Sequence, residues 1–331
     1  MGLSLAEPFY AAAAAWDGRR RERRRVTLDA PVVSVGNLTC GGTGKTPVVA
    51  WIANWLAANG HSPGLLSRGY RSLEESDGEG NVGNDEKRVL ATLCPGVPHV
   101  QQRDRIAAGR RLIGDGCDVL VLDDGFQYRQ LGRAVDLVVI DATQPWGYGH
   151  CLPRGLLREP KAGLRRATHV LINRVGAVDS RTLETIKGEV AALTDKAVMT
   201  ADVQPVGLLE LGGGRLPLES LLAGALPFCG LGNPAGFAAT LRKLGVEQPP
   251  RAFPDHHHYA ADDVRSLREA AAARGVSQVV CTQKDLVKLR GFDWGDVQVV
   301  AVEIALTIRE NESALVEALR ALRRNESNGE P

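Results

Sequence analysis

A glycine-rich turn that runs directly into Lys45 and Thr46 constrains the fold of this chain more than any other stretch. It follows a short β-branched run at residues 32–35 and precedes a helical pattern from Thr46 to Ala58. Glycines let backbone N–H groups turn inward around an anion, and a helix N-terminus adds partial positive charge. The stretch therefore predicts a phosphate-binding loop between a strand and a helix. Its candidate binding residues are Thr39, Cys40, Gly41, Gly42, Thr43, Gly44, Lys45 and Thr46.

Two side chains of this loop have predicted chemical roles. Lys45 is expected to reach the outer phosphates of a nucleotide, and the Thr46 hydroxyl is expected to bind Mg²⁺. The usual G-x-x-x-x-G-K-[ST] pattern fails at one position, because Thr39 stands where its first glycine belongs. The strand–turn–helix context nevertheless favours a nucleotide-binding loop over a surface turn with a chance lysine.

A carboxylate site for the metal follows the apolar run at residues 119–122, which ends in Asp123 and Asp124. Phosphate loops of this kind use an acid at the end of a neighbouring strand to hold Mg²⁺. Adjacent side chains at a strand end point in opposite directions. Both acids are therefore candidate metal ligands, and we expect one to touch the metal while the other holds a water or orients a partner.

Apolar runs alternate with helical patterns along the first two thirds of the chain, which predicts an α/β fold. The expected domain at residues 26–197 is a P-loop NTPase-type parallel sheet sandwiched by helices, with ligands at the carboxyl ends of its strands. The pattern changes at about residue 198, and a second alternation follows. We expect a linker at residues 198–218 and a smaller α/β domain at residues 219–331.

Composition excludes several classes of protein. Lys plus Arg number 40 against 39 Asp plus Glu, so the chain lacks the basic field typical of nucleic-acid-binding proteins. No apolar run approaches the ~20 residues of a membrane-spanning helix, which excludes an integral multi-pass protein. The six cysteines are scattered without a C-x-x-C pair, as expected for free thiols in a reducing compartment and not for a zinc site.

The N-terminal segment, residues 1–25, combines an aromatic and alanine-rich stretch from Phe9 to Trp16 with six arginines at residues 19–25. A secretory signal has the opposite order of charge and apolar residues. One interpretation is a helix in a membrane interface, whose arginines meet anionic headgroups at ~1 kcal/mol each. The other is an amphipathic helix packed on the domain, and the residues of this segment leave both open.

The stretch from Val33 to Pro47 resembles the tetraacyldisaccharide 4'-kinase (lipid A 4'-kinase) family. Further segments resemble this family in the same order, from about residue 31 to 290, so the resemblance covers nearly the whole chain. The segments are Ser67-Arg68-Gly69-Tyr70, Asp123-Asp124-Gly125-Phe126-Gln127, Leu152-Pro153 with Leu157-Arg158-Glu159-Pro160, Cys229-Gly230-Leu231-Gly232-Asn233-Pro234, Phe253-Pro254-Asp255-His256 and Thr282-Gln283-Lys284-Asp285.

The resemblance implies an ATP- and Mg²⁺-dependent kinase that phosphorylates the 4'-hydroxyl of a tetraacyldisaccharide 1-phosphate lipid A precursor. It implies two α/β domains with a two-stranded linker, the smaller domain closing a cleft that holds the active site. It also favours membrane association of residues 1–25. The expected partners are the lipid precursor and an anionic membrane surface, with no nucleic acid. We expect a monomer, peripheral or monotopic, at the cytoplasmic face of the inner membrane.

A sugar hydroxyl must lose its proton as it attacks phosphorus, so the enzyme needs a base that does not coordinate Mg²⁺. Asp85 and His256 match the family's motifs as an Asp base and a His that tunes or orients it. With Lys45 they form the predicted catalytic set. If Asp85 is not the base, the neighbouring candidates are Glu86 and Asp124.

Two other functions compete with a lipid kinase. The run His256-His257-His258 could deliver a metal in a P-loop metal-insertion GTPase or ATPase, although the stretch Asn173-Arg174-Val175-Gly176 lacks the Asp of a guanine-binding clamp. A partitioning-type switch ATPase would have a lysine where Cys40 stands. Neither alternative explains the second domain.

Overall fold

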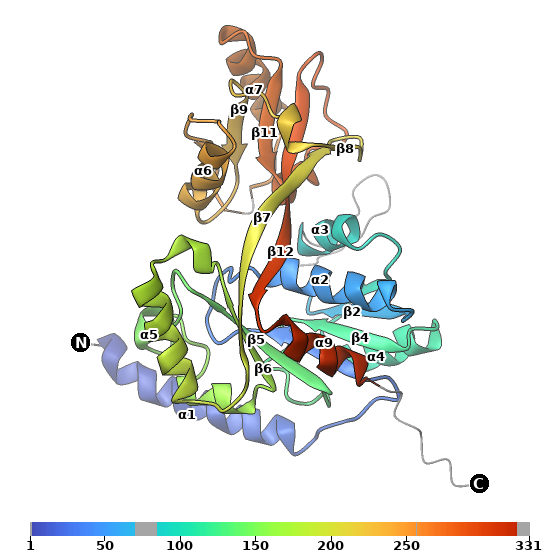
Figure 1. Cartoon of the computed structure of the whole chain (residues 1–331), viewed down its shortest axis with the longest axis vertical. Helices are drawn as coiled ribbons and strands as arrows, with labels where there is room; N and C mark the ends of the chain where they lie inside the picture. The colour runs from blue at the N-terminus through green and yellow to red at the C-terminus, as the bar shows by residue number, and fades with distance from the viewer. Residues whose placement is uncertain (1, 70–84, 256, 323–331) are drawn as a thin grey trace. The chain divides into compact units, whose positions relative to one another are not determined.

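The computed structural model describes residues 2–69, 85–255 and 257–322 (Figure 1). Their contacts divide them into two compact units. Unit 1 holds residues 2–69, 93–203 and 306–322, and unit 2 holds residues 85–92, 204–255 and 257–305. Strands β7 (Val198–Glu210) and β12 (Gln298–Glu310) each have residues in both units.

Unit 1 is built on a parallel sheet with β1 (Val32–Gly36) at its centre. Val35 pairs with Asp123 of β4 on one side and with Leu137 of β5 on the other, both in parallel register. The carboxyl ends of these three strands therefore lie along one edge of the sheet, where ligands of α/β proteins bind. The other strands are β2 (Pro63–Ser67) and β3 (His99–Gln101) beyond β4 (Val119–Asp123), and β6 (His169–Asn173) and β7 beyond β5 (Val135–Asp141).

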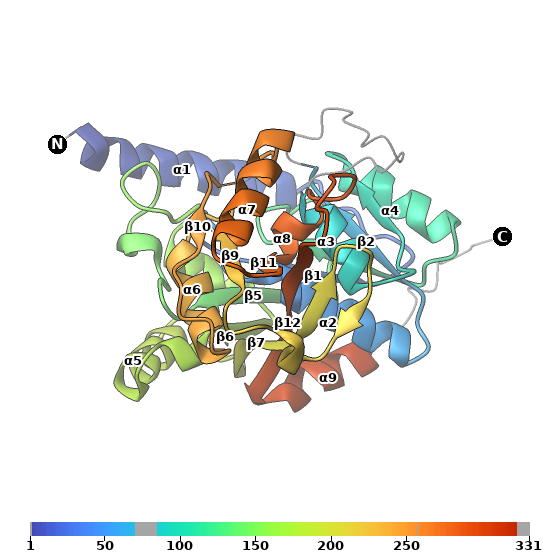
Figure 2. The same ribbon diagram turned by 90° about the horizontal axis from the view of Figure 1, so that it is seen from above.

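Helices cover both faces of this sheet. The chain crosses it in opposite directions through α2 (Lys45–Ala58) and α4 (Arg105–Gly114), and right-handed crossovers then place the two helices on opposite faces. Leu120 and Leu122 of β4 pack with Ala108 and Leu112 of α4. Figure 2 shows α1 (Gly2–Glu22) and α4 on one side of the central strands, and α2 and α9 (Glu312–Arg320) on the other. Helix α5 (Ser180–Ala191) connects β6 to β7.

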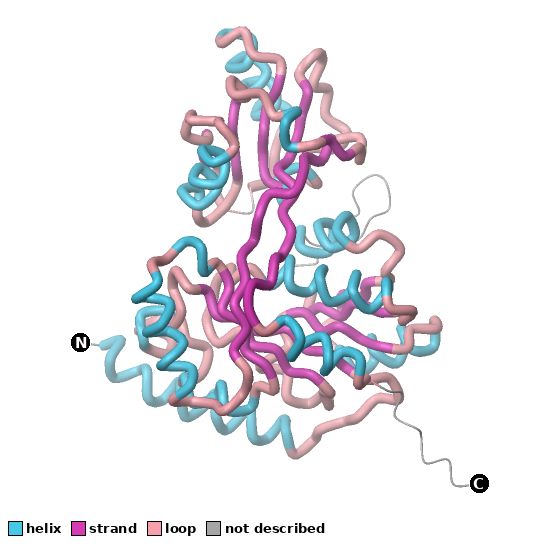
Figure 3. Tube along the Cα trace, viewed as in Figure 1, coloured by secondary structure: helices cyan, strands magenta, loops and turns pink. Residues whose placement is uncertain are grey.

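Unit 2 is a second α/β unit. Successive residues of a strand in its sheet point to opposite faces, and each face packs into a different buried cluster. Val279 and Cys281 belong to one buried cluster with Leu267 of α7, whereas Val280 belongs to another with Leu241 of α6. Its elements, coloured by type in Figure 3, are α3 (Asp85–Leu93), β8 (Arg215–Leu216), β9 (Leu226–Cys229), α6 (Pro234–Lys243), β10 (Arg251–Ala252), α7 (Ala261–Ala273), β11 (Gln278–Thr282) and α8 (Gln283–Leu286).

The predicted α/β class with a mostly parallel sheet is confirmed, with one difference in detail. Strand β8 pairs antiparallel with β7, so the sheet is mixed. Short 3₁₀ helices occupy Gly147–Gly149, Lys161–Arg166, Val175–Ala177 and Leu218–Ser220.

The end of the chain differs from the sequence expectation, which placed residues 219–331 in one domain. Residues 306–322 group with unit 1. Glu310 lies 3.0 Å from Lys187, Asn311 donates to the Val198 carbonyl, and His169 lies 3.3 Å from the Ala314 carbonyl. An apolar helical stripe predicts that a helix packs, but not on which sheet, so only these long-range contacts decide it. Residues 85–92, which the sequence expectation places in the domain at residues 26–197, group with unit 2. The other domain boundaries stay predictions.

Candidate active site

The loop between β1 and α2 has the backbone that an anion-binding turn requires. Gly41 (φ +103°) and Gly44 (φ +77°) adopt left-handed conformations, which favour glycine. Gly44 is the N-cap of α2 and has no side chain with which to cap it. The N–H groups of the first turn are therefore left for a ligand. Among the described atoms, none lies within 4 Å of a Cβ built on Gly41 or Gly42, and the buried Thr43 Oγ1 has no hydrogen-bond partner there. These features fit a phosphate group.

Lys45 is held at the mouth of this loop by two oxygens. Its Nζ donates to Asn37 Oδ1 at 3.1 Å and lies 3.3 Å from Asp124 Oδ1. Arg158 Nη1 donates to both carboxylate oxygens of Asp124, at 3.0 and 2.8 Å. Burial by itself raises the pKa of Asp124, but the charges and hydrogen bonds of Lys45 and Arg158 outweigh it and lower the pKa to about 2. Asp124 is therefore ionised at neutral pH and is a weak base.

The turn after β4 places Asp124 in this position. Asp124 has φ +52°, a left-handed conformation that is uncommon for a residue with a side chain. Gly125 follows, and a Cβ there would lie 2.5 Å from Ser34 Oγ. Of the two predicted acids, Asp124 orients cations. Asp123, at the end of β4, and Thr46, in the first turn of α2, stay predicted metal ligands.

We expect Asp124→Asn to lower stability at neutral pH and to have less effect in acid. The pKa is about 2 in the folded protein and 3.8 for an unperturbed group. The ionised carboxylate therefore stabilises the fold fully above about pH 5, and this contribution is lost as the pH falls towards 2. Melting temperatures of the two proteins from pH 7 to pH 3 should converge. Asp262→Asn, at an exposed acid of α7, is the control. A constant difference between wild type and Asp124→Asn would contradict this assignment.

A network of polar side chains around Glu159 supports the loop through Asn37. The buried Glu159 carboxylate accepts hydrogen bonds from Gln127 at 3.1 Å and Arg129 at 3.0 Å, and it pairs with Arg166 at 2.8 Å. Gln127 Nε2 also donates to the Asn37 carbonyl at 2.8 Å. The charged groups around the loop are thus held by one another and by the backbone, as preorganised sites require.

Sequence reasoning did not assign Asn37, Gln127, Arg158 or Glu159 to the site. All four lie inside stretches that carry the family resemblance. The available signal was the presence of polar residues inside those stretches, as in Leu157-Arg158. That signal does not say which partner each polar side chain meets.

The other side of the loop contacts Asn173, at the end of β6. Its Nδ2 donates to the Thr43 carbonyl at 3.3 Å, and a Cβ on Gly44 would lie 2.5 Å from the same nitrogen. The adjacent Arg174 pairs with Asp141, at the end of β5. The stretch considered above as a nucleotide-base clamp therefore packs against the phosphate loop.

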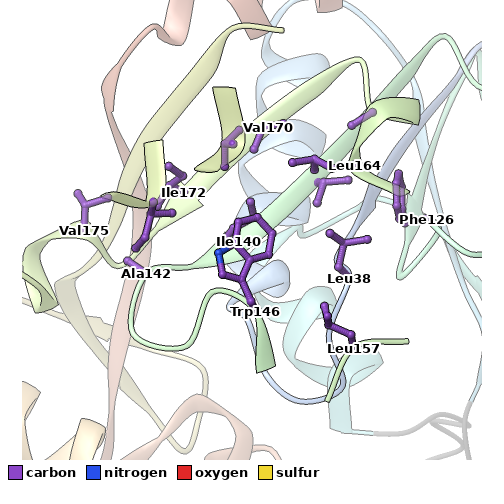
Figure 4. Close-up of a cluster of buried hydrophobic side chains, with 14 of the residues drawn as sticks. Leu38, Phe126, Ile140, Ala142, Trp146, Leu157, Leu164, Val170, Ile172 and Val175 are labelled. Carbon is purple, nitrogen blue, oxygen red and sulfur yellow. The ribbon is translucent and has the colours of Figure 1, made fainter. Parts of the chain in front are cut away.

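Thr39 and Cys40 line the start of the loop, beside the segment around Leu157. The Thr39 side chain is buried, and Thr39 forms a β-bridge with Leu157. The Cys40 N–H donates to the Leu156 carbonyl at 2.7 Å, and the Arg158 N–H donates to the Leu38 carbonyl at 2.7 Å. Leu38 and Leu157 both enter the buried cluster shown in Figure 4. Since the Cys40 N–H is already bonded, the geometry favours residues 41–46 as phosphate ligands.

The predicted base and its partner are Asp85 and His256. Asp85 begins α3, but its side chain lies outside the described residues, and so does His256. Their roles stay predictions. The neighbouring His257 Nε2 lies 2.9 Å from Asp263, and its ring stacks on Phe253. Within the described part of the chain, no three His, Cys, Asp or Glu side chains are grouped to hold a metal.

Comparison with known proteins decides among the predicted functions. The family model for tetraacyldisaccharide-1-P 4'-kinases matches residues 3–323. The chain belongs to this family. The tetraacyldisaccharide 4'-kinase of Syntrophus aciditrophicus (strain SB) is 37% identical, over 95% of this chain and 87% of the relative. That of Anaeromyxobacter dehalogenans (strain 2CP-C) is 40% identical, over 87% of this chain and 80% of the relative.

A solved structure agrees with these relatives. The crystal structure of LpxK from Aquifex aeolicus in complex with ATP matches with a TM-score of 0.73 and 25% identity, covering 95% of this chain and 97% of the other. The predicted family and function are confirmed: this tetraacyldisaccharide 4'-kinase is an ATP-dependent phosphotransferase of lipid A biosynthesis. The metal-insertion and switch-ATPase alternatives are therefore set aside.

Proposed function

We propose that Mg²⁺-ATP binds at residues 41–46 and that its γ-phosphate is transferred to the 4'-hydroxyl of a tetraacyldisaccharide 1-phosphate. One observation carries this assignment: the open N-terminus of α2 lies directly beside a lysine that Asn37 and Asp124 already hold in place. The ATP complex of the Aquifex aeolicus relative supports the choice of nucleotide.

Lys45 and Arg158 supply the positive charge for transfer. As the γ-phosphoryl leaves the nucleotide, negative charge builds on its oxygens and on the leaving β-phosphate. Cations that are held before the reaction stabilise this charge without further reorganisation. Asp124 holds both cations through its ion pairs. In this proposal Asp124 acts on the phosphates through its partners and does not receive the proton of the sugar.

Thr46 and Asp123 are proposed to hold Mg²⁺. A hydroxyl and a carboxylate are the hard oxygen ligands that this ion prefers, and Mg²⁺ keeps water and phosphate oxygens for its remaining positions. Bound Mg²⁺ would neutralise part of the charge of the phosphates. Asp124 is the weaker candidate for a ligand, because its oxygens already bind Lys45 and Arg158.

The sugar hydroxyl gives its proton to a carboxylate as it attacks phosphorus. We assign this proton to Asp85, with His256 orienting or tuning the base. The low pKa of Asp124 argues against it as the acceptor, since a base whose pKa is about 2 holds a proton poorly at neutral pH. Glu86 stays the alternative.

Incubation of the purified protein with radiolabelled ATP and a detergent-solubilised tetraacyldisaccharide 1-phosphate tests this function. We expect a bisphosphorylated lipid whose label is at the 4' position. A lipid that already carries a 4'-phosphate is the matched control and should take up no label. Equal labelling of both lipids, or ATP consumption without labelled lipid, would overturn the proposal.

Membrane contact is proposed for α1, at the cytoplasmic face of the inner membrane. In the described part of the chain no helix is both long and apolar enough to cross a membrane. The outer face of α1 instead exposes Phe9 (78%) and Trp16 (60%), with Ala12 and Ala13 between them at helical spacing. Arginines follow directly, and Arg20 lies over the Trp16 ring. Such a face suits an anionic interface.

We expect Phe9→Ser combined with Trp16→Ser to lower binding to anionic vesicles by more than tenfold. Burying one large apolar side chain contributes about 1.5–3 kcal/mol, so the loss of two exceeds a factor of ten. Co-sedimentation measures the binding. Leu222→Ser removes an exposed apolar side chain of unit 2 and is the control. Unchanged binding of the double variant would show that α1 serves as a packed helix without membrane contact.

A further inference from the structure

The face of α1 that packs on unit 1 contacts the segment beside the phosphate loop. Glu7 and Tyr10 lie one turn apart on this face, which points away from the exposed Phe9 and Trp16. The Tyr10 hydroxyl donates to the Arg158 carbonyl at 3.2 Å. Glu7 Oε1 accepts the Cys151 N–H at 2.9 Å and lies 3.2 Å from His150 Nδ1. Two side chains of the helix thus hold residues 150–158 at both ends.

The same segment supports the start of the phosphate loop. The Leu156 carbonyl accepts the Cys40 N–H, and the Arg158 N–H donates to the Leu38 carbonyl. The Arg158 side chain reaches Asp124. Arg158 is therefore held through three groups: its N–H by the Leu38 carbonyl between β1 and the loop, its guanidinium by Asp124, and its carbonyl by Tyr10.

The contact between α1 and this segment is not closely packed throughout. An open groove of about 360 Å³ separates them over part of their length. Pro8 and Ala11 line it from α1, and Cys151 and Leu157 line it from the segment. Beside this groove, Tyr10 and Ala11 pack against the buried cluster that contains Cys151 and Leu157, and the hydrogen bonds of Glu7 and Tyr10 add polar contacts to the same segment.

We propose that α1 braces the phosphate site as well as facing the membrane, and that Tyr10 is a positioning residue that acts on phosphoryl transfer through Arg158. This inference rests on the role of Arg158 in the proposed function. Without the Tyr10 hydroxyl, the Arg158 carbonyl loses a hydrogen-bond donor. Residues 150–158 can then shift, and the Arg158 guanidinium can move away from Asp124 and Lys45. Misplaced cations stabilise the transition state less. The N–H groups of α2 are untouched, so ATP binding should change little.

The first test is Tyr10→Phe, assayed with detergent-solubilised lipid so that membrane binding plays no part. We expect kcat to fall about three- to tenfold, the KM for ATP to stay within twofold, and vesicle binding to match wild type. Tyr148→Phe removes the same hydroxyl from a side chain that is 73% exposed, and it is the matched control. A kcat for Tyr10→Phe equal to that of Tyr148→Phe would overturn the proposal.

A double-mutant cycle then separates positioning from general support of the fold. If Tyr10 acts through Arg158, Tyr10→Phe lowers kcat no further in an Arg158→Ala background. An equal fold-loss of kcat in both backgrounds would make the role of Tyr10 structural and refute the proposal.

Hydrogen exchange supplies a readout that needs no catalysis. We expect Tyr10→Phe to speed amide exchange in peptides that contain Cys40 and Arg158, because both N–H groups bond across the braced contact. Exchange equal to wild type would refute the brace. Failure of wild type to phosphorylate the lipid would overturn the proposed function alone, since the exchange measurement still decides the inference.

Discussion

Replacing Lys45 with alanine is expected to lower kcat for phosphoryl transfer by about 10²–10³-fold while the protein stays folded. The substitution removes the ammonium that Asn37 Oδ1 and Asp124 hold beside the loop. Arg158 still pairs with Asp124, so the local structure retains a cation. The loss should therefore fall on the charge that develops in the transition state more than on the fold.

Steady-state kinetics and circular dichroism of the Lys45→Ala protein measure these two effects separately. Lys243→Ala, at an exposed lysine of α6, is the matched control and should keep wild-type turnover. A Lys45→Ala enzyme that works within a few-fold of wild type, with an unchanged spectrum, would show that this loop does not hold the transferred phosphate.

Substitution of the proposed base, Asp85→Ala, is expected to lower kcat by about 10²–10⁴-fold, with little change in ATP affinity. His256→Ala should lower kcat in the same way, because the two side chains are proposed to act as a unit. The fold-loss of kcat in the double variant should then be much smaller than the product of the fold-losses in the two single variants. Neither residue is proposed to touch the phosphates or the metal.

Asp123→Ala provides the contrast for this pair, since a metal ligand should change the Mg²⁺ dependence and the nucleotide affinity that goes with it. The measurements are kcat, the KM for ATP and a Mg²⁺ titration on all four variants. Near-normal kcat in Asp85→Ala would transfer the role of base to Glu86. Asp124 is a poor substitute because its pKa is about 2.

Much of unit 1 could be predicted because its signals are local. Val33 and Val35 are β-branched and apolar, Gly41 and Gly44 have left-handed backbones, and Lys45 opens a helix whose apolar stripe is regular. Neighbouring residues determine each of these properties, so they can be recognised without knowing the fold. The same local stretches carried the resemblance through which the family was predicted and then confirmed.

The site itself could be predicted only in part. Of the two adjacent acids, one is expected to touch the metal and the other to hold a water or orient a partner, but the sequence does not say which; the structure shows that Asp124 pairs with Lys45 and Arg158. Arg158 lies 34 residues from Asp124 along the chain, so no local pattern announces the pair. Asp85 and His256 depend on the family's motifs alone, because the described structure includes neither side chain.

Local patterns along the chain are enough to predict the phosphate loop, the alternating strands and helices, and the family. Only the folded protein shows which charges meet at the loop, that the last helix packs on unit 1, and that Tyr10 reaches Arg158 across 148 residues of chain. The physical reason is that backbone propensity and periodicity act over a few residues, whereas ion pairs depend on strand register and helix packing. Those follow from the burial of the whole core.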